Sequence, residues 1–329
     1  MKRFFVLITF LCFQLQPEAQ TKPVIKNLVF EGAGIRGIAY CGAIHEMELT
    51  GMMQQVEKVA GTSSGAVVAL TISLGYTGSE IQEIITGTNF KKFNDGRYFF
   101  AGGINRINKY FGWYRGNRIE NWIEEIIKQK TGNADITFKE LHQKGFKDLY
   151  ITGTCLNKQK LIIFSHETYP KMKVKDAVRI SMSIPLYFES VFIDKDGNVI
   201  QQPKKNAVDL DVMVDGGLTG NFPIRIFDSA SVHNEATLGF RIDSDEQIKN
   251  DKESKKLAPM PVGNLKEYLN AFYNMAIENL NRQQLTFEDW QRTVSISDGK
   301  IGPRIRKLSE EDLTVLIENG RQAMKNFLH

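Results

Sequence analysis

The segment Val59-Ala60-Gly61-Thr62-Ser63-Ser64-Gly65-Ala66-Val67 constrains this chain most, because a G-x-S-x-G core stands between two apolar runs. The pattern is typical of a nucleophile elbow, in which a strand ends, one serine occupies a strained tight turn and a helix begins at once. Gly61 and Gly65 fit this geometry because strand and helix backbones come too close there for a Cβ atom. A plain Gly/Ser turn is the alternative for the motif alone, so the rest of the chain must distinguish the two.

A glycine-rich loop lies ahead of this motif. Asn27–Phe30 predicts a short buried strand, Glu31–Gly37 follows it as EGAGIRG, and Ile38–Met52 has helical apolar spacing. A dinucleotide site would need an acidic residue about 20 positions on, at the end of a second strand, but Glu57 lies inside the short strand 56–60. A P-loop would need a lysine that this loop lacks. We therefore expect backbone N–H groups at a helix N-terminus, suited to hold an oxyanion.

Strands and helices alternate along the rest of the chain, which predicts an α/β fold with a sheet covered by helices on both faces. One apolar strand, 209–214, ends in Asp215-Gly216-Gly217 and so places a carboxylate at a strand end. Further strands are expected at 149–155, 160–164, 191–193, 199–200, 238–242 and 293–296. Further helices are expected at 66–74, at 80–86 with Ser79 as its cap, at 117–131 with Asn117 as its cap, and at 174–182, 265–280 and 309 onward.

A serine hydroxyl needs a base beside it to act as a nucleophile near neutral pH. None of the five histidines sits in a recognisable motif. The chain order Ser63, Asp215, His233 would still allow the triad of an α/β-hydrolase. A nucleophile on the second strand comes early for that fold, so this triad stays an alternative.

Four motifs in order, EGAGIRGI at 31–38, GTSSG at 61–65, SMSIP at 181–185 and DGG at 215–217, resemble those of patatin-like phospholipases. The resemblance covers about residues 25–242 and implies a three-layer α/β fold with a mostly parallel central sheet. Members are lipid acyl hydrolases with a Ser–Asp dyad and no histidine. The resemblance thus implies Ser63 as nucleophile and Asp215 as the base that takes its proton.

The same resemblance assigns the surrounding residues. Backbone N–H groups of Gly32, Ala33 and Gly34, with that of Ser64, would form the oxyanion hole, and no metal or cofactor is expected. The supporting motif residues are Arg36, Gly37, Gly61, Gly65, Gly216 and Gly217. Arg36 would orient a phosphate or brace the loop. The family loop usually has three successive glycines, and Ala33 would cost of order 1 kcal/mol if its position required a positive φ.

The expected function is hydrolysis of carboxylic ester bonds in lipids or phospholipids through an acyl-enzyme. A non-catalytic lipid- or membrane-binding protein on the same scaffold is the alternative. The expected partners are a lipid ester and, transiently, a membrane or micelle surface. The net charge of +4 and the lack of long basic runs argue against nucleic acid. Aromatic and basic residues alternate in 90–116, which predicts either a loop over the core or an interfacial lid.

The first 19 residues predict a signal peptide, because Lys2 and Arg3 precede a ten-residue apolar run that is followed by Ala19. Export of the protein follows from this prediction, and a retained N-terminal anchor is the alternative. The remaining domains are expected to be a catalytic domain over 24–243, a charged and Pro-rich surface segment over 244–263, and a C-terminal helical section over 264–329 that packs on the catalytic domain. Cys41 and Cys155 are expected to be buried apolar residues, with a disulfide left open.

Overall fold

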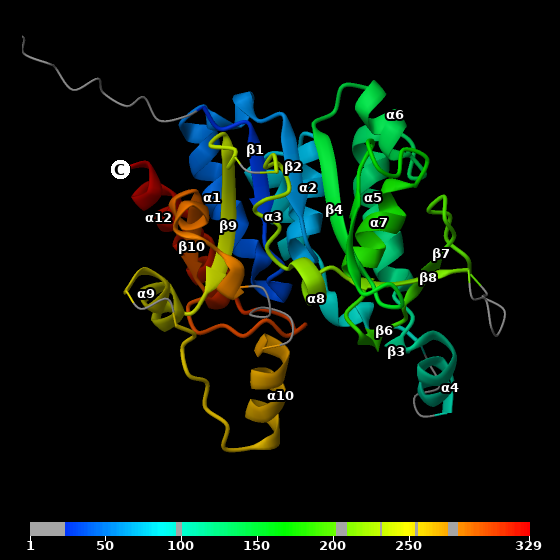
Figure 1. Ribbon diagram of the computed structural model, residues 1–329. Coiled ribbons are helices and arrows are strands. Elements are labelled where there is room, and N and C mark those ends of the chain that lie inside the picture. Colours follow the sequence, from blue (N-terminus) through cyan, green and yellow to red (C-terminus); the bar gives the residue numbers. More distant parts are fainter. Residues whose placement is uncertain (1–23, 97–100, 202–208, 231, 254–255, 276–281) are drawn as a thin grey trace, which may run out of the picture.

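The computed structural model describes residues 24–329 except 97–100, 202–208, 231, 254–255 and 276–281 (Figure 1). The expected signal peptide, residues 1–19, lies outside the described residues. None of the described helices combines the length and apolar character needed to span a membrane.

An eight-stranded sheet with the order β10-β9-β1-β2-β4-β8-β7 forms the centre of the molecule, and β5 pairs with β4 as well. Neighbours from β10 through β4 pair in parallel, whereas β5, β8 and β7 join in antiparallel fashion. The predicted α/β fold with a largely parallel sheet is therefore confirmed. The strands are β1 (Asn27–Phe30), β2 (Lys58–Gly61), β4 (Asp148–Cys155), β5 (Lys160–Phe164), β7 (Val191–Ile193), β8 (Asp211–Asp215), β9 (Thr237–Asp243) and β10 (Thr293–Ser297).

Strands β2 and β8 meet end to end along one edge of β4. Residues 153–155 of β4 pair with both β5 and β8, so these two strands lie on opposite edges of β4. Ile151 pairs with both Gly61 of β2 and Phe164 of β5, so β2 also lies opposite β5. It follows that β2 and β8 share one edge of β4 and run toward each other, with their last residues opposite Ile151 and Gly153.

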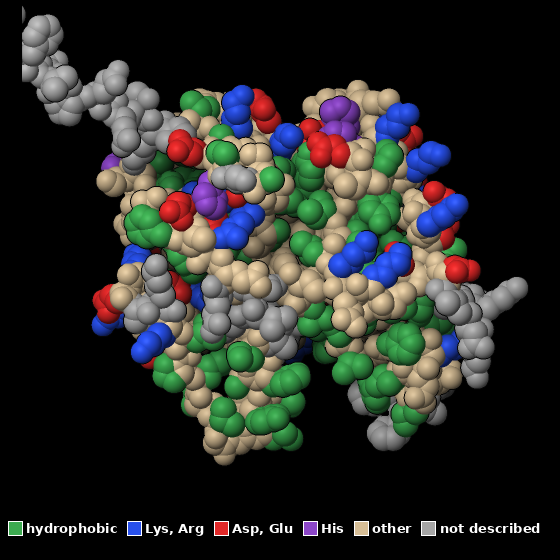
Figure 2. Space-filling model, viewed as in Figure 1, with side chains coloured by type: hydrophobic (Ala, Val, Ile, Leu, Met, Phe, Trp, Pro, Cys, Tyr) green, Lys and Arg blue, Asp and Glu red, His purple; other side chains and the backbone are tan. Residues whose placement is uncertain are grey.

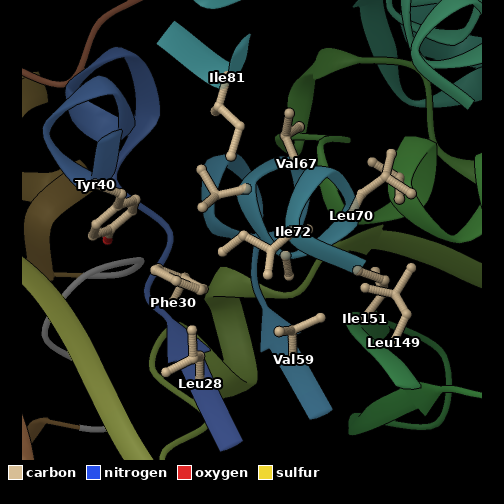
Figure 3. Close-up of a cluster of buried hydrophobic side chains, with 14 of the residues drawn as sticks. Leu28, Phe30, Tyr40, Val59, Val67, Leu70, Ile72, Ile81, Leu149 and Ile151 are labelled. Carbon is tan, nitrogen blue, oxygen red and sulfur yellow. The ribbon is translucent and has the colours of Figure 1, made fainter. Parts of the chain in front are cut away.

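Side chains of the strands alternate between the two faces of the sheet. Leu28 and Phe30 of β1 point into the larger core, which also contains Val59, Leu70 and Ile151 (Figure 3). Val29 points to the opposite face and joins a smaller cluster built with the segment 222–227. The helices that bury the larger core include α1 (Ala39–Leu49), α2 (Ser64–Ser73), α3 (Gly78–Thr86), α5 (Asn117–Thr131), α6 (Phe138–Gln143), α7 (Val174–Ser181) and α12 (Glu310–Leu328).

Two segments expected to be irregular contain regular structure. The segment 90–116 holds a 3-10 helix (Phe90–Phe93), α4 (Ala101–Tyr110) and β3 (Gly112–Tyr114). β3 pairs with β6 (Leu186–Phe188) in a separate two-stranded sheet, so a plain covering loop is the wrong description. The charged segment 244–263 contains α9 (Asp245–Glu253), which Arg282 fixes to the body of the protein by hydrogen bonds to Asp251.

The N-cap residues of two helices differ from the predicted ones. Thr77 rather than Ser79 caps α3, and it forms a reciprocal capping box with Glu80. At α5 the N-cap is Gly116, which has a φ of 81°, and the predicted cap Asn117 is the first helical residue. Ser309 caps α12 with Asp312, as predicted.

The C-terminal section is integral to the fold. β10 forms an edge of the sheet and α12 packs tightly on α1, where a Cβ at Gly320 would lie 1.9 Å from the carbonyl oxygen of Ala39. The fold also contains the short helix α8 (Gly217–Gly220), which contacts β4 and β5, and the short helix α11 (Phe287–Gln291), which precedes β10. By contrast α10 (Leu265–Tyr273) leaves its large apolar side chains exposed instead of packing them on the catalytic domain.

Candidate active site

Ser63 stands on the predicted strand–turn–helix. β2 ends at Gly61, α2 begins at Ser64, and Ser63 between them has a φ of 52° and a ψ of −120°. Such a backbone is costly for a residue with a side chain and is found at functional sites. Both motif glycines are required by close approach: a Cβ at Gly61 would lie 2.2 Å from the Gly65 carbonyl oxygen, and one at Gly65 would lie 2.4 Å from that of Phe30.

Asp215 is the last residue of β8 and its carboxylate is buried. Its side chain accepts a hydrogen bond from the Gly217 N–H at 2.8 Å, and the side chain of Ser63 lies near enough to interact with it. Burial raises the pKa of Asp215 to about 7, and the interactions with the Gly217 N–H and the Ser63 side chain oppose that rise. The pair therefore joins a serine to a carboxylate that is far more basic than usual.

The glycine loop differs in detail from the expected oxyanion loop. The Gly32 N–H donates to the carbonyl oxygen of Asn221 at 3.1 Å, so the expectation that Gly32 donates to an oxyanion does not hold in this structure. The Ala33 N–H donates to Ser64 Oγ at 3.0 Å and is free only when that hydroxyl turns away. Among the described residues, none accepts a hydrogen bond from the N–H of Gly34 or of Ser64.

Alanine is well tolerated at position 33. Its φ is −133°, whereas the positive φ of the loop, +57°, falls on Gly34. A Cβ at Gly34 would lie 2.2 Å from the Pro303 carbonyl oxygen. Ala33, which replaces the middle glycine of the family loop, therefore does not carry the strain of a positive φ.

The supporting residues hold the loop and the strand ends together. Arg36 is buried, donates from Nε to the Ala33 carbonyl oxygen and pairs with Asp298 at 3.5 Å, which supports its bracing role. A Cβ at Gly37 would lie 3.0 Å from the side chain of Ser64, and one at Gly216 would lie 2.3 Å from Thr152 Oγ1. Gly217 supplies the N–H that binds Asp215.

Sequence reasoning missed several residues of the site. Ser181 Oγ accepts the Ser63 N–H at 2.9 Å and so fixes the strained turn. Asn221 accepts the Gly32 N–H and donates from Nδ2 to the Gly32 carbonyl oxygen at 3.0 Å. Ser181 lies in the SMSIP motif, which marked its position without giving its role, and nothing in the sequence marked Asn221.

An apolar cavity opens beside the nucleophile. Ser63, Ser64 and Gly34 are among its lining residues. The other lining residues are almost all apolar and come from several elements; they include Ile38, Val67, Val68, Ile85, Phe90, Phe93, Ile119, Trp122, Met182, Phe188 and Ile305. A wider groove of about 960 Å³ adjoins it, because Gly34, Ile184 and Ile305 line both spaces.

The alternative triad is contradicted by the position of His233. This residue precedes β9, at the amino ends of the parallel strands, whereas Ser63 follows the carboxyl end of β2. His233 contacts Asp228 at 3.2 Å and Arg292 at 3.3 Å, within a cluster of ion pairs. No histidine among the described residues lines the cavity beside Ser63.

Two groups of described residues have the composition of metal ligands, and neither reaches Ser63. Asp228, His233 and Asp289 are already bound by guanidinium groups, including that of Arg292. His142, Asp148 and His166 gather at the start of β4, again at the amino ends of the parallel strands. Cys41 and Cys155 are free buried thiols.

Comparison with known proteins finds relatives of similar sequence. The protein YqhO of Bacillus subtilis (strain 168) is 34% identical over 209 residues, which cover 60% of this chain and 65% of that protein. The probable lipid hydrolase 463L of Invertebrate iridescent virus 6 is 26% identical over 229 residues, which cover 68% of each chain.

Similar folds occur among solved structures. VipD from Legionella pneumophila matches with a TM-score of 0.59 and 17% identity over 93% of this chain and 67% of its own. The type III effector ExoU matches with a TM-score of 0.50 and 14% identity over 93% of this chain and 53% of its own. A family model for patatin-like phospholipases matches residues 28–228. The chain belongs to the patatin-like phospholipase family.

Proposed function

We propose that this protein is a serine lipid acyl hydrolase that cleaves carboxylic ester bonds of lipids or phospholipids through a Ser63–Asp215 dyad. Family membership supports lipid hydrolysis in general. The observation that carries the finer proposal is that Ser63, on a strained turn, lies near a buried carboxylate, that of Asp215, whose pKa burial raises to about 7. A base of that pKa suits proton transfer near neutral pH.

In the first step Ser63 Oγ attacks the ester carbonyl carbon while its proton passes to Asp215. The negative charge that develops on the carbonyl oxygen is stabilised by the N–H groups of Gly34 and Ser64, which line the cavity at the nucleophile. The ester bond then breaks, and the leaving alkoxide takes the proton from Asp215 and departs as an alcohol. A water molecule attacks the acyl-enzyme with Asp215 again as base, which releases a carboxylic acid and restores Ser63.

The substrate class follows from the shape and polarity of the two spaces. The apolar cavity that begins at Ser63 suits the hydrocarbon chain of an acyl group. The wider groove has polar as well as apolar lining and suits the rest of the lipid, including a headgroup. We infer a phospholipase A-type reaction that requires no metal or cofactor, in a protein exported after removal of residues 1–19.

The direct test combines labelling with turnover. The protein would be treated with a fluorophosphonate probe and assayed on p-nitrophenyl esters and phospholipid vesicles, in parallel with Ser63→Ala and Asp215→Asn. We expect the label on Ser63, loss of activity in both variants, and retained activity in EDTA.

His233→Ala is the matched control, because it changes the residue of the alternative triad and leaves the dyad intact. It should keep its activity. Full activity of Ser63→Ala would refute the proposal. A protein that binds vesicles but neither reacts with the probe nor hydrolyses any ester would be a non-catalytic lipid-binding protein.

A further inference from the structure

Helix α10 carries an exposed apolar stripe. Leu265, Tyr268, Leu269 and Phe272 follow the i, i+3, i+4, i+7 spacing of one helix face, and all are exposed. Met275 extends the same face by a further turn and is also exposed. Such a stripe normally faces a protein core, yet here it faces outward.

Hydrogen bonds between neighbouring residues cap the N-terminal end of this helix. Asn264 Oδ1 accepts the Glu267 N–H at 3.0 Å, and the Glu267 carboxylate accepts the Gly263 N–H. Among the described elements, none packs extensively against α10, which projects from the body of the molecule (Figure 1). The apolar face of α10 is therefore available to a partner outside the described part of the chain.

A second apolar projection extends from the same lower edge of the molecule in Figure 1. It is formed by α4 with the small sheet of β3 and β6, and it exposes Ile104, Phe111 and Leu186. Phe111 and Leu186 both have positive φ values, 61° and 66°, which are unusual for large apolar residues. Figure 2 shows hydrophobic side chains gathered on both projections, at the lower edge of the view, with few charged side chains among them.

The groove connects these projections with the nucleophile. Leu269 and Met260 line it on the side of α10, and Tyr187 of β6 lines it next to Leu186. Its inner residues Ile184 and Ile305 also line the cavity that holds Ser63. A continuous path of mixed polar and apolar lining thus leads from the two projections to the candidate active site.

We propose that α10 and the α4–β3–β6 projection together form a docking surface that inserts into the surface of a lipid bilayer. An amphipathic helix with Leu, Phe and Tyr on its apolar face is suited to lie in a membrane interface. A protein partner or a second copy seated across both projections would close the groove between them, whereas a bilayer would supply lipid to it. The passage of lipid substrate along this path to Ser63 rests on the function proposed above. The docking to a bilayer does not depend on that function.

The test uses the double variant Leu265→Asn/Phe272→Asn, because these residues lie on the stripe but do not line the groove. Leu49→Asn/Phe287→Asn is the matched control: Leu49 is 68% exposed against 73% for Leu265, and Phe287 is 58% exposed against 64% for Phe272. Leu49 and Phe287 lie on elements that precede β2 and β10, away from the groove. Binding to vesicles of phosphatidylcholine, with and without phosphatidylglycerol, would be measured by sedimentation, with Ser63→Ala added throughout.

We expect the stripe variant to lose about tenfold or more in vesicle partitioning while the control keeps it, with little dependence on the anionic lipid. With Ser63 restored, hydrolysis of vesicle lipid should fall in the stripe variant, and hydrolysis of a soluble short-chain ester should stay within about twofold. Equal vesicle binding by both variants, or a dimer that the stripe substitutions dissociate, would overturn the proposal. Vesicle binding without hydrolysis of any ester would instead count against the proposed function and leave the docking surface intact.

Discussion

Ser63 and Asp215 lie near each other because β2 and β8 approach each other along one edge of β4. Gly61 pairs with Ile151 and Asp215 with Gly153, so the ends of the two strands are close on the ladder. The antiparallel insertion of β8 into a largely parallel sheet thus brings the carboxylate to the elbow.

The first prediction concerns the pH dependence of turnover. Asp215 must be ionised to accept the proton of Ser63, and burial raises its pKa to about 7. We therefore expect kcat/KM to fall about tenfold per pH unit below pH 7 and to level off above it. The profile would be measured with a soluble ester whose own ionisation lies outside this range. A profile already flat from pH 5 upward would contradict the raised pKa.

The second prediction concerns stability. An unfolded Asp ionises near pH 4, so between about pH 4 and 7 the folded protein keeps a proton that the unfolded chain has lost. Stability must then decrease as the pH rises through that window. Asp215→Asn removes this loss, and its amide oxygen can still accept the Gly217 N–H.

The Asn variant should therefore be inactive yet more stable than the parent at pH 8, by an amount on the order of a few kcal/mol, with the advantage vanishing near pH 4. Urea unfolding at both pH values measures this difference. A variant less stable than the parent at pH 8 would show that ionised Asp215 is not costly to the fold.

The third prediction concerns backbone strain at the elbow. Ser63 has a φ of 52°, which glycine adopts far more readily than alanine. Ser63→Gly should thus be more stable than Ser63→Ala by about 1 kcal/mol, although both lack the nucleophile. Thermal unfolding of the two variants gives the comparison.

Position 64 provides the control, since Ser64 is already in helix α2. There the order should reverse, with Ser64→Gly less stable than Ser64→Ala because glycine disfavours a helix. The same order at both positions would argue against strain at Ser63.

The fourth prediction compares neighbouring residues of the glycine loop. Gly34→Ala would place a Cβ against Pro303 at a φ of +57° and displace the N–H assigned to the oxyanion. We expect its kcat to fall by a factor on the order of a hundred. Ala33→Gly should change kcat by less than about twofold, because Ala33 has an ordinary φ of −133° and its N–H is bound by Ser64. An equal fall in kcat for Gly34→Ala and Ala33→Gly would mean that other N–H groups stabilise the oxyanion.

The sequence predicted those parts of the site that depend on local backbone geometry. Gly61 and Gly65 mark the elbow because a Cβ at either position would collide with backbone atoms, and this need is visible as G-x-S-x-G. The end of the strand at Asp215 was likewise predictable from its apolar run. The family resemblance, confirmed by the matching family model over residues 28–228, linked these distant motifs.

The remaining features depend on contacts between distant parts of the chain. The loss of Gly32 as a donor arises from Asn221, which the fold brings beside the loop, and no local pattern records that contact. The amphipathic spacing of α10 predicted a helix correctly but could not say whether its apolar face meets the core. Similarly, the alternation in 90–116 did not reveal that β3 would pair with β6, since pairing depends on a partner strand far along the chain.

The fifth prediction concerns the length of the acyl chain. Trp122 lines the apolar cavity and packs against Phe90 and Phe93, with ring centroids 5.9 and 5.4 Å away. Trp122→Ala removes this ring and enlarges the cavity, so the variant should shift its preference toward longer acyl chains. We expect the ratio of kcat/KM for a long-chain ester to that for a short-chain ester to rise about tenfold, which corresponds to roughly 1.4 kcal/mol of additional apolar contact.

Trp290→Ala provides the matched control, because Trp290 packs against Arg241 and Arg282 and does not line the cavity. It should leave the ratio unchanged even if it lowers stability, since the ratio compares two substrates of the same folded enzyme. The measurement uses p-nitrophenyl esters of increasing chain length. A ratio that changes equally in both variants, or falls in Trp122→Ala, would mean that the acyl chain does not enter the cavity lined by Trp122.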